Sequence, residues 1–315
     1  MQSKPSLKQL FVDLERERQQ ILVKEKKPRL IGTIICICSI PVFIFTETFI
    51  GFIVLSVGGF FLIIAQILQK PFLKKFKSTV IGKLVKLINP DLEYDPHGGF
   101  GMFYLYEAGL IQNRPTMYES EDRIYGKIGL TEVDICEHKL RRKEVTRDSK
   151  GKQKTKIVTL FSGLVVSADF HKNFNGTMLI VPDTADSASW KWMAKQFESK
   201  SKGDQKIVKL EDPEFEKVYT VYATDQIEAR YILSPSFMQR MVKMYQKLNE
   251  QAKASISLSF KNERMIMAVD WQNNFFEYTF HKSVEEEVRE TISELKLCTD
   301  IVDELNLNTR IWSKQ

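Results

Sequence analysis

Residues 30–68 read LIGTIICICSIPVFIFTETFIGFIVLSVGGFFLIIAQIL, and this stretch decides the architecture of the chain. Among its 39 residues the only one charged at neutral pH is Glu47, which lies close to the midpoint. A membrane helix needs roughly 20 residues to cross about 30 Å of hydrocarbon. The stretch is about twice too long for one crossing, so it predicts two transmembrane helices that turn at residues 46–48.

Two other interpretations of this stretch stay open. It is also compatible with a buried helical hairpin of a soluble protein, and with a re-entrant hairpin that enters and leaves the membrane on one face. A signal peptide is not expected, because 29 residues precede the stretch and no small-residue cleavage site closes it.

The charges beside the stretch predict its orientation. Residues 1–29 carry eight Lys and Arg against four acids, and residues 70–86 carry six Lys and no acid. Lys and Arg near membrane ends stay on the cytoplasmic side. Because both flanks are basic, we expect both termini in the cytoplasm, which two crossings or a re-entrant loop allow and one crossing does not.

The same charges explain the net charge of +6. Residues 1–86 sum to +9, which leaves −3 on the other 229 residues. With 43% hydrophobic and 27% charged residues the composition is globular, so a disordered chain and a many-pass transporter are excluded. An acidic main domain argues against nucleic acid as a partner.

Helical periodicity flanks the apolar stretch on both sides. Residues 6–27 predict an amphipathic helix that either packs on protein or touches lipid. Residues 72–88 predict a basic amphipathic helix that lies in the membrane interface, with docking on the soluble domain as the alternative. Its candidate headgroup-binding residues are Lys74, Lys75, Lys77, Lys83 and Lys86.

Four segments follow from these patterns. They are a cytoplasmic helical segment (1–29), a transmembrane hairpin (30–69), a basic interfacial helix (70–89) and a cytoplasmic domain (90–315). In the last segment, β-type runs predict strands and three periodic runs predict helices. The predicted fold class is α+β, with a mostly antiparallel sheet and packed helices. Strands are expected at 130–145, 156–169, 177–181, 218–223, 255–260, 265–270 and 275–280, and helices at 185–200, 235–250 and 284–305.

Two hairpins are expected in this sheet. A turn containing Gly151 predicts a long antiparallel hairpin between 130–145 and 156–169, and residues 261–264 predict a tighter one. Nine basic residues between 139 and 156 make the long hairpin basic. It is either a solvated turn or a contact for headgroups or an acidic protein, with Arg141, Arg142 and Lys143 as its candidate membrane-binding residues.

The sequence carries no recognised catalytic or metal motif. The four cysteines and four histidines lack metal-site spacing, and the glycine-rich residues 97–101 lack the Lys-Ser/Thr of a P-loop. We therefore expect no metal, no cofactor and no assigned catalytic residue. A polar cluster is the one alternative for an enzyme; its members would be Asp169, His171, Asp225, Glu228 and Arg230, and a structural ion pair explains such a cluster more often.

Five blocks carry a resemblance to a known family. They are residues 160–164 (LFSGL), 169–177 (DFHKNFNGT), 215–222 (FEKVYTVY), 225–235 (DQIEARYILSP) and 305–312 (LNLNTRIW). The chain resembles a bacterial membrane protein family known as domain of unknown function 3137. The resemblance implies a bacterial membrane protein with an N-terminal helical hairpin. Together with the basic flanks, the expected location is the bacterial inner membrane, with a multi-pass chain. The resemblance implies no activity, ligand or catalytic residue.

The sequence thus favours a membrane-anchored cytoplasmic module that binds a protein partner or the membrane surface. The expected partners are the bilayer, above all anionic headgroups, and a protein or a second copy of the chain. An enzyme built on the polar cluster is the alternative. A transport or channel component is disfavoured, because Glu47 at the turn is the only charge in the spans.

Overall fold

The computed structural model describes residues 7–45, 48–102, 104–105, 108–110, 115–147, 153–183, 206–251, 254–271 and 275–304. The chain divides into two compact units. The helical-hairpin unit comprises Met1–Ile81 and Glu277–Ile292, and the sheet unit comprises Gly82–Phe276 and Ser293–Gln315. The predicted boundaries at residues 29, 69 and 89 stay predictions, because contacts within the fold, and not membrane position, define the two units.

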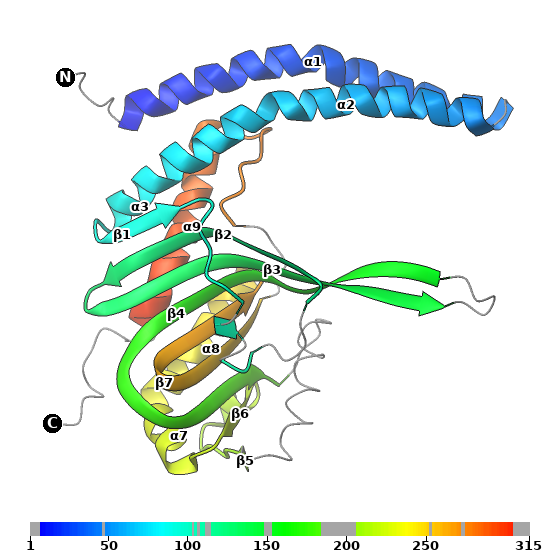
Figure 1. The fold of residues 1–315 in the computed structure, drawn as a ribbon. Helices are drawn as coiled ribbons and strands as arrows, with labels where there is room; N and C mark the ends of the chain where they lie inside the picture. Colours follow the sequence, from blue (N-terminus) through cyan, green and yellow to red (C-terminus); the bar gives the residue numbers. More distant parts are fainter. Residues whose placement is uncertain are drawn as a thin grey trace. The chain divides into compact units, whose positions relative to one another are not determined.

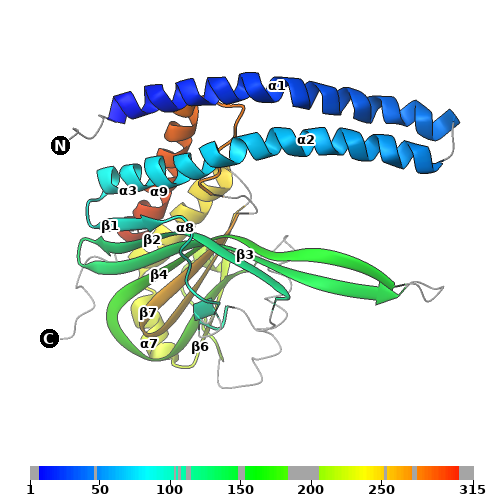
Figure 2. The ribbon, with the colours of Figure 1, turned by 45° about the horizontal axis from the view of Figure 1, so that its top comes forward.

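Two long helices form the hairpin. They are α1 (Leu7–Phe45) and α2 (Thr48–Phe76), which lie side by side in both views (Figures 1 and 2). A π-helical turn, Lys77–Ile81, follows α2. The sequence predicted a separate helix over residues 6–27, but α1 continues through Pro28 without a break. A proline removes one backbone hydrogen bond. Glu25 and Arg29, on either side of Pro28, form an ion pair at 3.4 Å.

Glycines of the two helices face each other at one close crossing of α1 and α2. A Cβ placed on Gly32 would lie 2.9 Å from the Gly58 carbonyl oxygen, and one placed on Gly58 would lie 2.6 Å from Cys36 Sγ. Small residues that let backbones touch are typical of helices that associate inside membranes. No larger side chain fits at this crossing without moving one helix.

The polar half of the hairpin packs on the segment Glu277–Ile292 of the same unit. Phe72 and Phe76 of α2 pack edge-to-face against Tyr278 with ring centroids 5.2 and 4.6 Å away, and Phe72 packs edge-to-face against Phe280 at 5.5 Å. Both Phe72 and Phe76 are fully buried. An aromatic cluster of this kind contributes packing energy beyond the area that it buries.

Polar contacts fix α1 to the same segment. Arg18 pairs with Glu15 at 2.7 Å and donates to the Phe280 carbonyl oxygen at 3.2 Å. Glu15 also accepts from the backbone N–H of Val284 at 3.0 Å, where α9 (Val284–Glu304) begins. Of the two interpretations of residues 6–27, packing on the protein itself is therefore the one observed.

The sheet unit is built on a seven-stranded sheet whose pairs are all antiparallel. The strand order is β1-β2-β3-β4-β6-β5, and β7 pairs with the opposite edge of β4. This arrangement confirms the predicted α+β class with two long apolar helices before the sheet. The strands are β1 (Leu92–Asp95), β2 (Met117–Ile128), β3 (Thr131–Arg147), β4 (Gln153–Pro182), β5 (Lys206–Ile207), β6 (Tyr219–Ala223) and β7 (Ser255–Asp270).

The long strand β4 organises this sheet. Its first half pairs with β3, its last residues pair with β6, and β7 follows it from Gly163 to Ile180. The predicted hairpin between β3 and β4 is confirmed, with Arg147 opposite Gln153; the turn itself, residues 148–152, lies outside the described residues.

Two predictions for this sheet are wrong: the tight hairpin at residues 261–264 and the strand at residues 275–280. The runs 156–169 and 177–181 belong to the single strand β4, and the runs 255–260 and 265–270 belong to the single strand β7. The polar residues 261–264 form no turn, because they pair with β4 across two register shifts that absorb the irregular spacing. Residues 275–280 form no strand.

Helices accompany the sheet, and two of them were predicted. One of these two is α8 (Pro235–Gln251), which starts as expected, with Ser234 Oγ accepting from the Phe237 N–H at 3.3 Å. At the start of α9 the predicted capping box is present, since Ser283 and Glu286 exchange hydrogen bonds of 2.8 and 3.3 Å. The predicted helix 185–200 lies outside the described residues. The remaining helices are α3 (Gly82–Ile88), α6 (Pro213–Glu216) and α7 (Gln226–Ile232).

The glycine crossing predicts a matched pair of substitutions. Gly58→Ala should weaken the hairpin by about 1–3 kcal/mol, because the new methyl group overlaps Cys36 and the Gly32 carbonyl. Gly59→Ala is the control, since a Cβ there has no described atom within 4 Å. Thermal unfolding of both variants in detergent measures the difference. Equal melting temperatures would show that α1 and α2 do not cross at these glycines.

Candidate functional site

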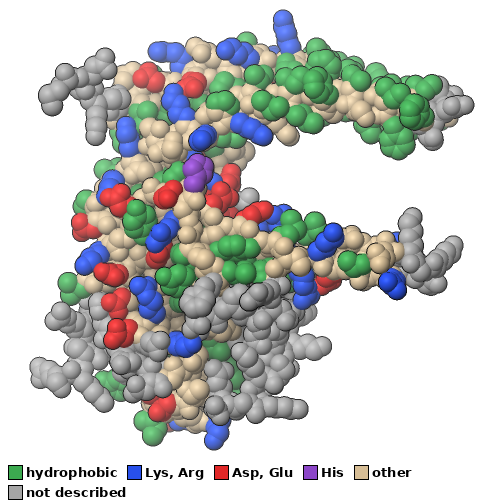
Figure 3. Space-filling model, viewed as in Figure 1, with side chains coloured by type: hydrophobic (Ala, Val, Ile, Leu, Met, Phe, Trp, Pro, Cys, Tyr) green, Lys and Arg blue, Asp and Glu red, His purple; other side chains and the backbone are tan. Residues whose placement is uncertain are grey.

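The hairpin half nearest its turn exposes a large apolar surface. Two continuous helical stretches are long and apolar enough to cross a membrane. One is Leu7–Ile44 within α1, and the other is Phe49–Ile88, which runs from α2 through the π-helical turn into α3. Figure 3 shows hydrophobic side chains covering the hairpin toward the turn, whereas charged side chains gather over its other half. The exposed members include Ile37, Ile40, Ile44, Phe49, Phe52 and Phe60. Apolar surface this extensive is typical of a membrane or protein contact.

The lysines predicted to bind headgroups are mostly in ion pairs. Lys75 pairs with Glu17 at 2.5 Å and Lys77 pairs with Glu277 at 3.0 Å, both within the helical-hairpin unit. In the sheet unit, Lys86 pairs with Glu93 at 2.6 Å. The two others differ in exposure: Lys74 is exposed and Lys83 is half-buried.

The apolar stripe predicted to lie in lipid beside these lysines is placed differently. Its residues Phe72 and Phe76 are buried inside the protein, whereas Leu87 is exposed. These two phenylalanines contact Tyr278 and Phe280, so lipid contact through them is excluded. Headgroup binding by the lysines themselves stays a prediction.

The basic residues of β3 lie at the base of its long ribbon with β4. Arg141 is paired with Glu119 of β2, and Arg142 is paired with Glu144 at 2.5 Å. Lys143 is exposed, two residues beyond Arg141, at which the ladder of β2 on β3 ends. The structure thus gives the two arginines acidic neighbours, and their binding to a membrane surface stays a prediction.

Members of the predicted polar cluster have local structural contacts. Asp225 is the N-cap of α7 and accepts from the N–H groups of Ile227 and Glu228 at 2.8 and 3.0 Å. Arg230 donates to the carbonyl oxygens of Lys209 and Gln226 at 3.4 Å.

The other two members belong to β4. Asp169 lies opposite Arg264 in the ladder between β4 and β7, and the side chain of His171 lies outside the described part. A shared reactive site of Asp169, His171, Asp225, Glu228 and Arg230 therefore stays a prediction.

Sequence reasoning missed a pocket of about 650 Å³ in the sheet unit. The glycine-rich loop forms one side, with Gly99, Phe100 and Gly101, and β2 forms the other, from Tyr118 to Glu121. The loop lies close to the strand because Tyr118 Oη donates to the Phe100 carbonyl oxygen at 2.6 Å. A Cβ on Gly99 would collide with Ser120, so only glycine fits there.

Cys136 and His138 of β3 lie behind this pocket, both fully buried. His138 is opposite Ser120 in the ladder, so its side chain points to the same face as Ser120 and Tyr118. Its ring packs between Phe100 and Tyr118, with centroids 4.8 and 5.6 Å away. Neither ring nitrogen of His138 has a hydrogen-bond partner among the described residues.

Burial keeps both groups neutral. Desolvation lowers the pKa of His138 to about 3, and it raises the pKa of Cys136 to about 11. The Cys136 thiol contacts Ser120 Oγ at 3.1 Å and the Glu121 carbonyl oxygen at 3.0 Å. Both side chains fill the interior behind the loop, where their neutral forms pack without a charge to solvate.

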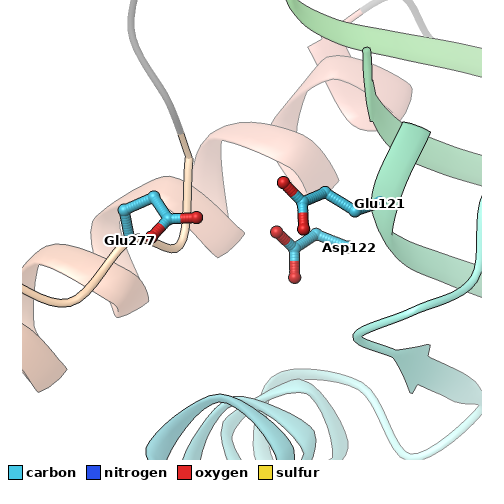
Figure 4. A group of neighbouring side chains, drawn as sticks. All are labelled: Glu121, Asp122 and Glu277. Carbon is cyan, nitrogen blue, oxygen red and sulfur yellow. The ribbon is translucent and has the colours of Figure 1, made fainter. Parts of the chain in front are cut away.

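Figure 4 shows Glu121 and Asp122 beside each other at the β-bulge of β2. Asp122 is buried, has a left-handed φ of 58°, and accepts from Tyr94 Oη at 2.5 Å. The third carboxylate drawn there, Glu277, belongs to the helical-hairpin unit.

Comparison with known proteins assigns part of the chain to a family. Residues 159–307 match a family described as "Protein of unknown function (DUF3137)". This match supports the resemblance to that family which the sequence indicated. No curated protein is similar to the chain. The matched residues include most of β4 and the described elements from β5 through α9. The α1–α2 hairpin, the glycine-rich loop, Cys136 and His138 precede them in the sequence.

One solved structure is weakly similar to this chain. It is the crystal structure of the mycobacterial trehalose monomycolate transport factor A, TtfA, at 11% identity and a TM-score of 0.32. The alignment covers 73% of this chain and 96% of that chain. A likeness at this level supports no conclusion about fold or function.

Because His138 is buried in its neutral form, we expect the stability of the folded chain to depend on pH. The folded chain keeps His138 neutral down to about pH 3, whereas an unfolded His binds a proton below about pH 6.5. Its contribution to stability is therefore present above about pH 6.5 and is lost as the pH falls toward 3. At about pH 5 the loss is about 2 kcal/mol.

Urea unfolding of the purified chain in detergent at about pH 7 and about pH 5 measures this loss. His138→Phe should remove about 2 kcal/mol of the difference between the two pH values. His97→Phe, at an exposed position, is the control and should leave the difference unchanged. An unchanged difference in the His138 variant would show that the imidazole is not buried in neutral form.

Proposed function

We propose that this chain is a membrane-anchored module, in which the apolar half of the α1–α2 hairpin lies in the bilayer and the sheet unit is held at its surface. The exposed apolar half of the hairpin is the observation that supports this proposal. In the most apolar windows of the two helices, only 11% and 17% of the residues are buried in the protein. A soluble hairpin of this composition would be mostly buried, and burying each large side chain contributes about 1.5–3 kcal/mol.

The lengths of the apolar segments fit a bilayer. In α2, residues 48–68 extend about 32 Å at 1.5 Å per residue, which matches a hydrocarbon core of about 30 Å. In α1, residues 30–45 extend about 24 Å, at the short end for a crossing. Two antiparallel crossings with basic residues on both flanks would leave both termini on the cytoplasmic side of a bacterial inner membrane.

The role that we propose for the surface-held unit is binding, in a scaffold or regulatory capacity. Burial keeps Cys136 and His138 neutral, and Asp225 caps a helix. These roles support a structural use of the groups that an enzyme would need. The partners are the membrane surface, with its anionic headgroups, and a protein or a second copy of the chain.

Charge substitutions on the exposed apolar face test the anchor. Ile53→Asp together with Phe60→Asp should move the chain from the carbonate-washed membrane pellet to the supernatant or to aggregates. Each acid near the bilayer centre costs about 2.5–3.5 kcal/mol, and both native side chains are exposed. Val23→Asp is the control, since Val23 is 73% exposed on the polar half of α1. Retention of the double variant would contradict membrane insertion.

Accessibility of the turn separates two crossings from a re-entrant hairpin. In a chain with Cys36 and Cys38 replaced by Ser, Thr48→Cys should react in intact cells with a maleimide that does not cross membranes. Val23→Cys should react only after the cells are opened, because the proposed topology places it in the cytoplasm. Labelling of neither site in intact cells, with the chain still resistant to carbonate, would indicate the re-entrant form.

A further inference from the structure

The β3–β4 arm, residues 143–147 with 153–157, is a surface that the proposed anchor does not use. Among the described residues, these pair only with each other as strands: the ladder of β2 on β3 ends at Arg141, and that of β7 on β4 starts at Gly163. Both views show the arm projecting from the sheet (Figures 1 and 2). A two-stranded ribbon without further support is marginally stable in water, so a partner would stabilise it.

The two faces of the arm differ in character. Because side chains alternate along a strand, Lys143, Val145 and Arg147 share one face with Gln153, Thr155 and Ile157 opposite them. Val145 and Ile157 are 55% and 53% exposed. The other face carries Glu144, Thr146, Lys154 and Lys156. One face therefore presents two branched apolar side chains flanked by two cations.

We propose that this face of the arm docks on an anionic lipid surface, with Val145 and Ile157 entering the boundary between headgroups and acyl chains and with Lys143 and Arg147 on lipid phosphates. Cationic side chains around an apolar centre are the composition of interfacial membrane contacts. The described arm carries four Lys and Arg against Glu144 alone, so its charge is complementary to such a surface.

This proposal rests on the proposed function. A bilayer anchor would keep the arm at high effective concentration near headgroups, so that a weak contact is populated. The apolar pair distinguishes lipid from other anionic partners. The phosphate backbone of nucleic acid offers no apolar layer that would cover Val145 and Ile157, whereas the acyl boundary does.

The test uses the full chain in vesicles and places a fluorescent label on either face of the arm. With Cys36 and Cys38 replaced by Ser, Thr155→Cys carries the label on the apolar face, and Thr146→Cys carries it on the other face as the control; both positions are exposed. The vesicles contain phosphatidylcholine alone or mixed with phosphatidylglycerol, with spin-labelled acyl chains as quenchers. We expect about twofold or greater quenching at position 155 relative to 146, only with phosphatidylglycerol, and we expect salt to weaken it.

Two further variants separate the contributions to this contact. Lys143→Glu with Arg147→Glu should abolish the quenching at position 155, and Val145→Ser with Ile157→Ser should reduce it while the charge is kept. Quenching that is equal at 146 and 155, or equal with and without phosphatidylglycerol, would overturn the assigned face. No quenching in a chain that resists carbonate would overturn the arm contact and leave the anchor intact.

Failure of the anchor gives a different result. A chain that carbonate releases would overturn the proposed function, and its arm is then tested by adding the same vesicles to the labelled full chain in solution. Quenching there would support the lipid contact without the anchor. If a crosslinker at position 155 captures an acidic protein, and no lipid quenches the label, the arm is a protein-binding surface and the proposal is wrong.

Discussion

The contact between α1 and α2 at Gly32 and Gly58 is the constraint on which the helical-hairpin unit depends. With the two backbones touching, large side chains cannot lie between the helices there, so those of the apolar half point outward. In the polar half, by contrast, large side chains are covered, because Phe72, Phe76 and Arg18 pack on the segment Glu277–Ile292. The helix pair thus has two kinds of surface. The surface of its polar half is covered by the chain itself, and the surface of its apolar half is exposed.

In the sheet unit, β4 plays the corresponding part. It pairs with β3, β6 and β7, so neighbours far apart in the sequence meet along one strand. The glycine-rich loop is held on this sheet through Tyr118 and Phe100, over the buried Cys136 and His138. The Cys136 thiol and the His138 imidazole are neutral here, because burial disfavours their charged forms.

Local signals predicted the elements that local chemistry determines. The apolar run, Pro235 after Ser234, and Ser283 with Glu286 correctly indicated the hairpin, α8 and α9. Polar residues at 261–264 were misread as a turn, because only their pairing with β4 shows that they continue a strand. The short α7 and the polar β2 lacked a periodic signal, and the burial of His138 depends on a loop about 38 residues earlier in the chain.

The β3–β4 arm has one more consequence for a chain that carries it. Beyond Lys143 and before Ile157, both outer edges of the ribbon present backbone N–H and C=O groups that no described strand covers. Such edges are templates for the addition of another strand, and so for clumping between copies. Lys154, Lys156 and Arg147 stand beside these edges on every copy, and their mutual repulsion opposes that pairing. Arg147, which the proposed lipid contact uses, therefore also opposes strand pairing between two copies of the arm.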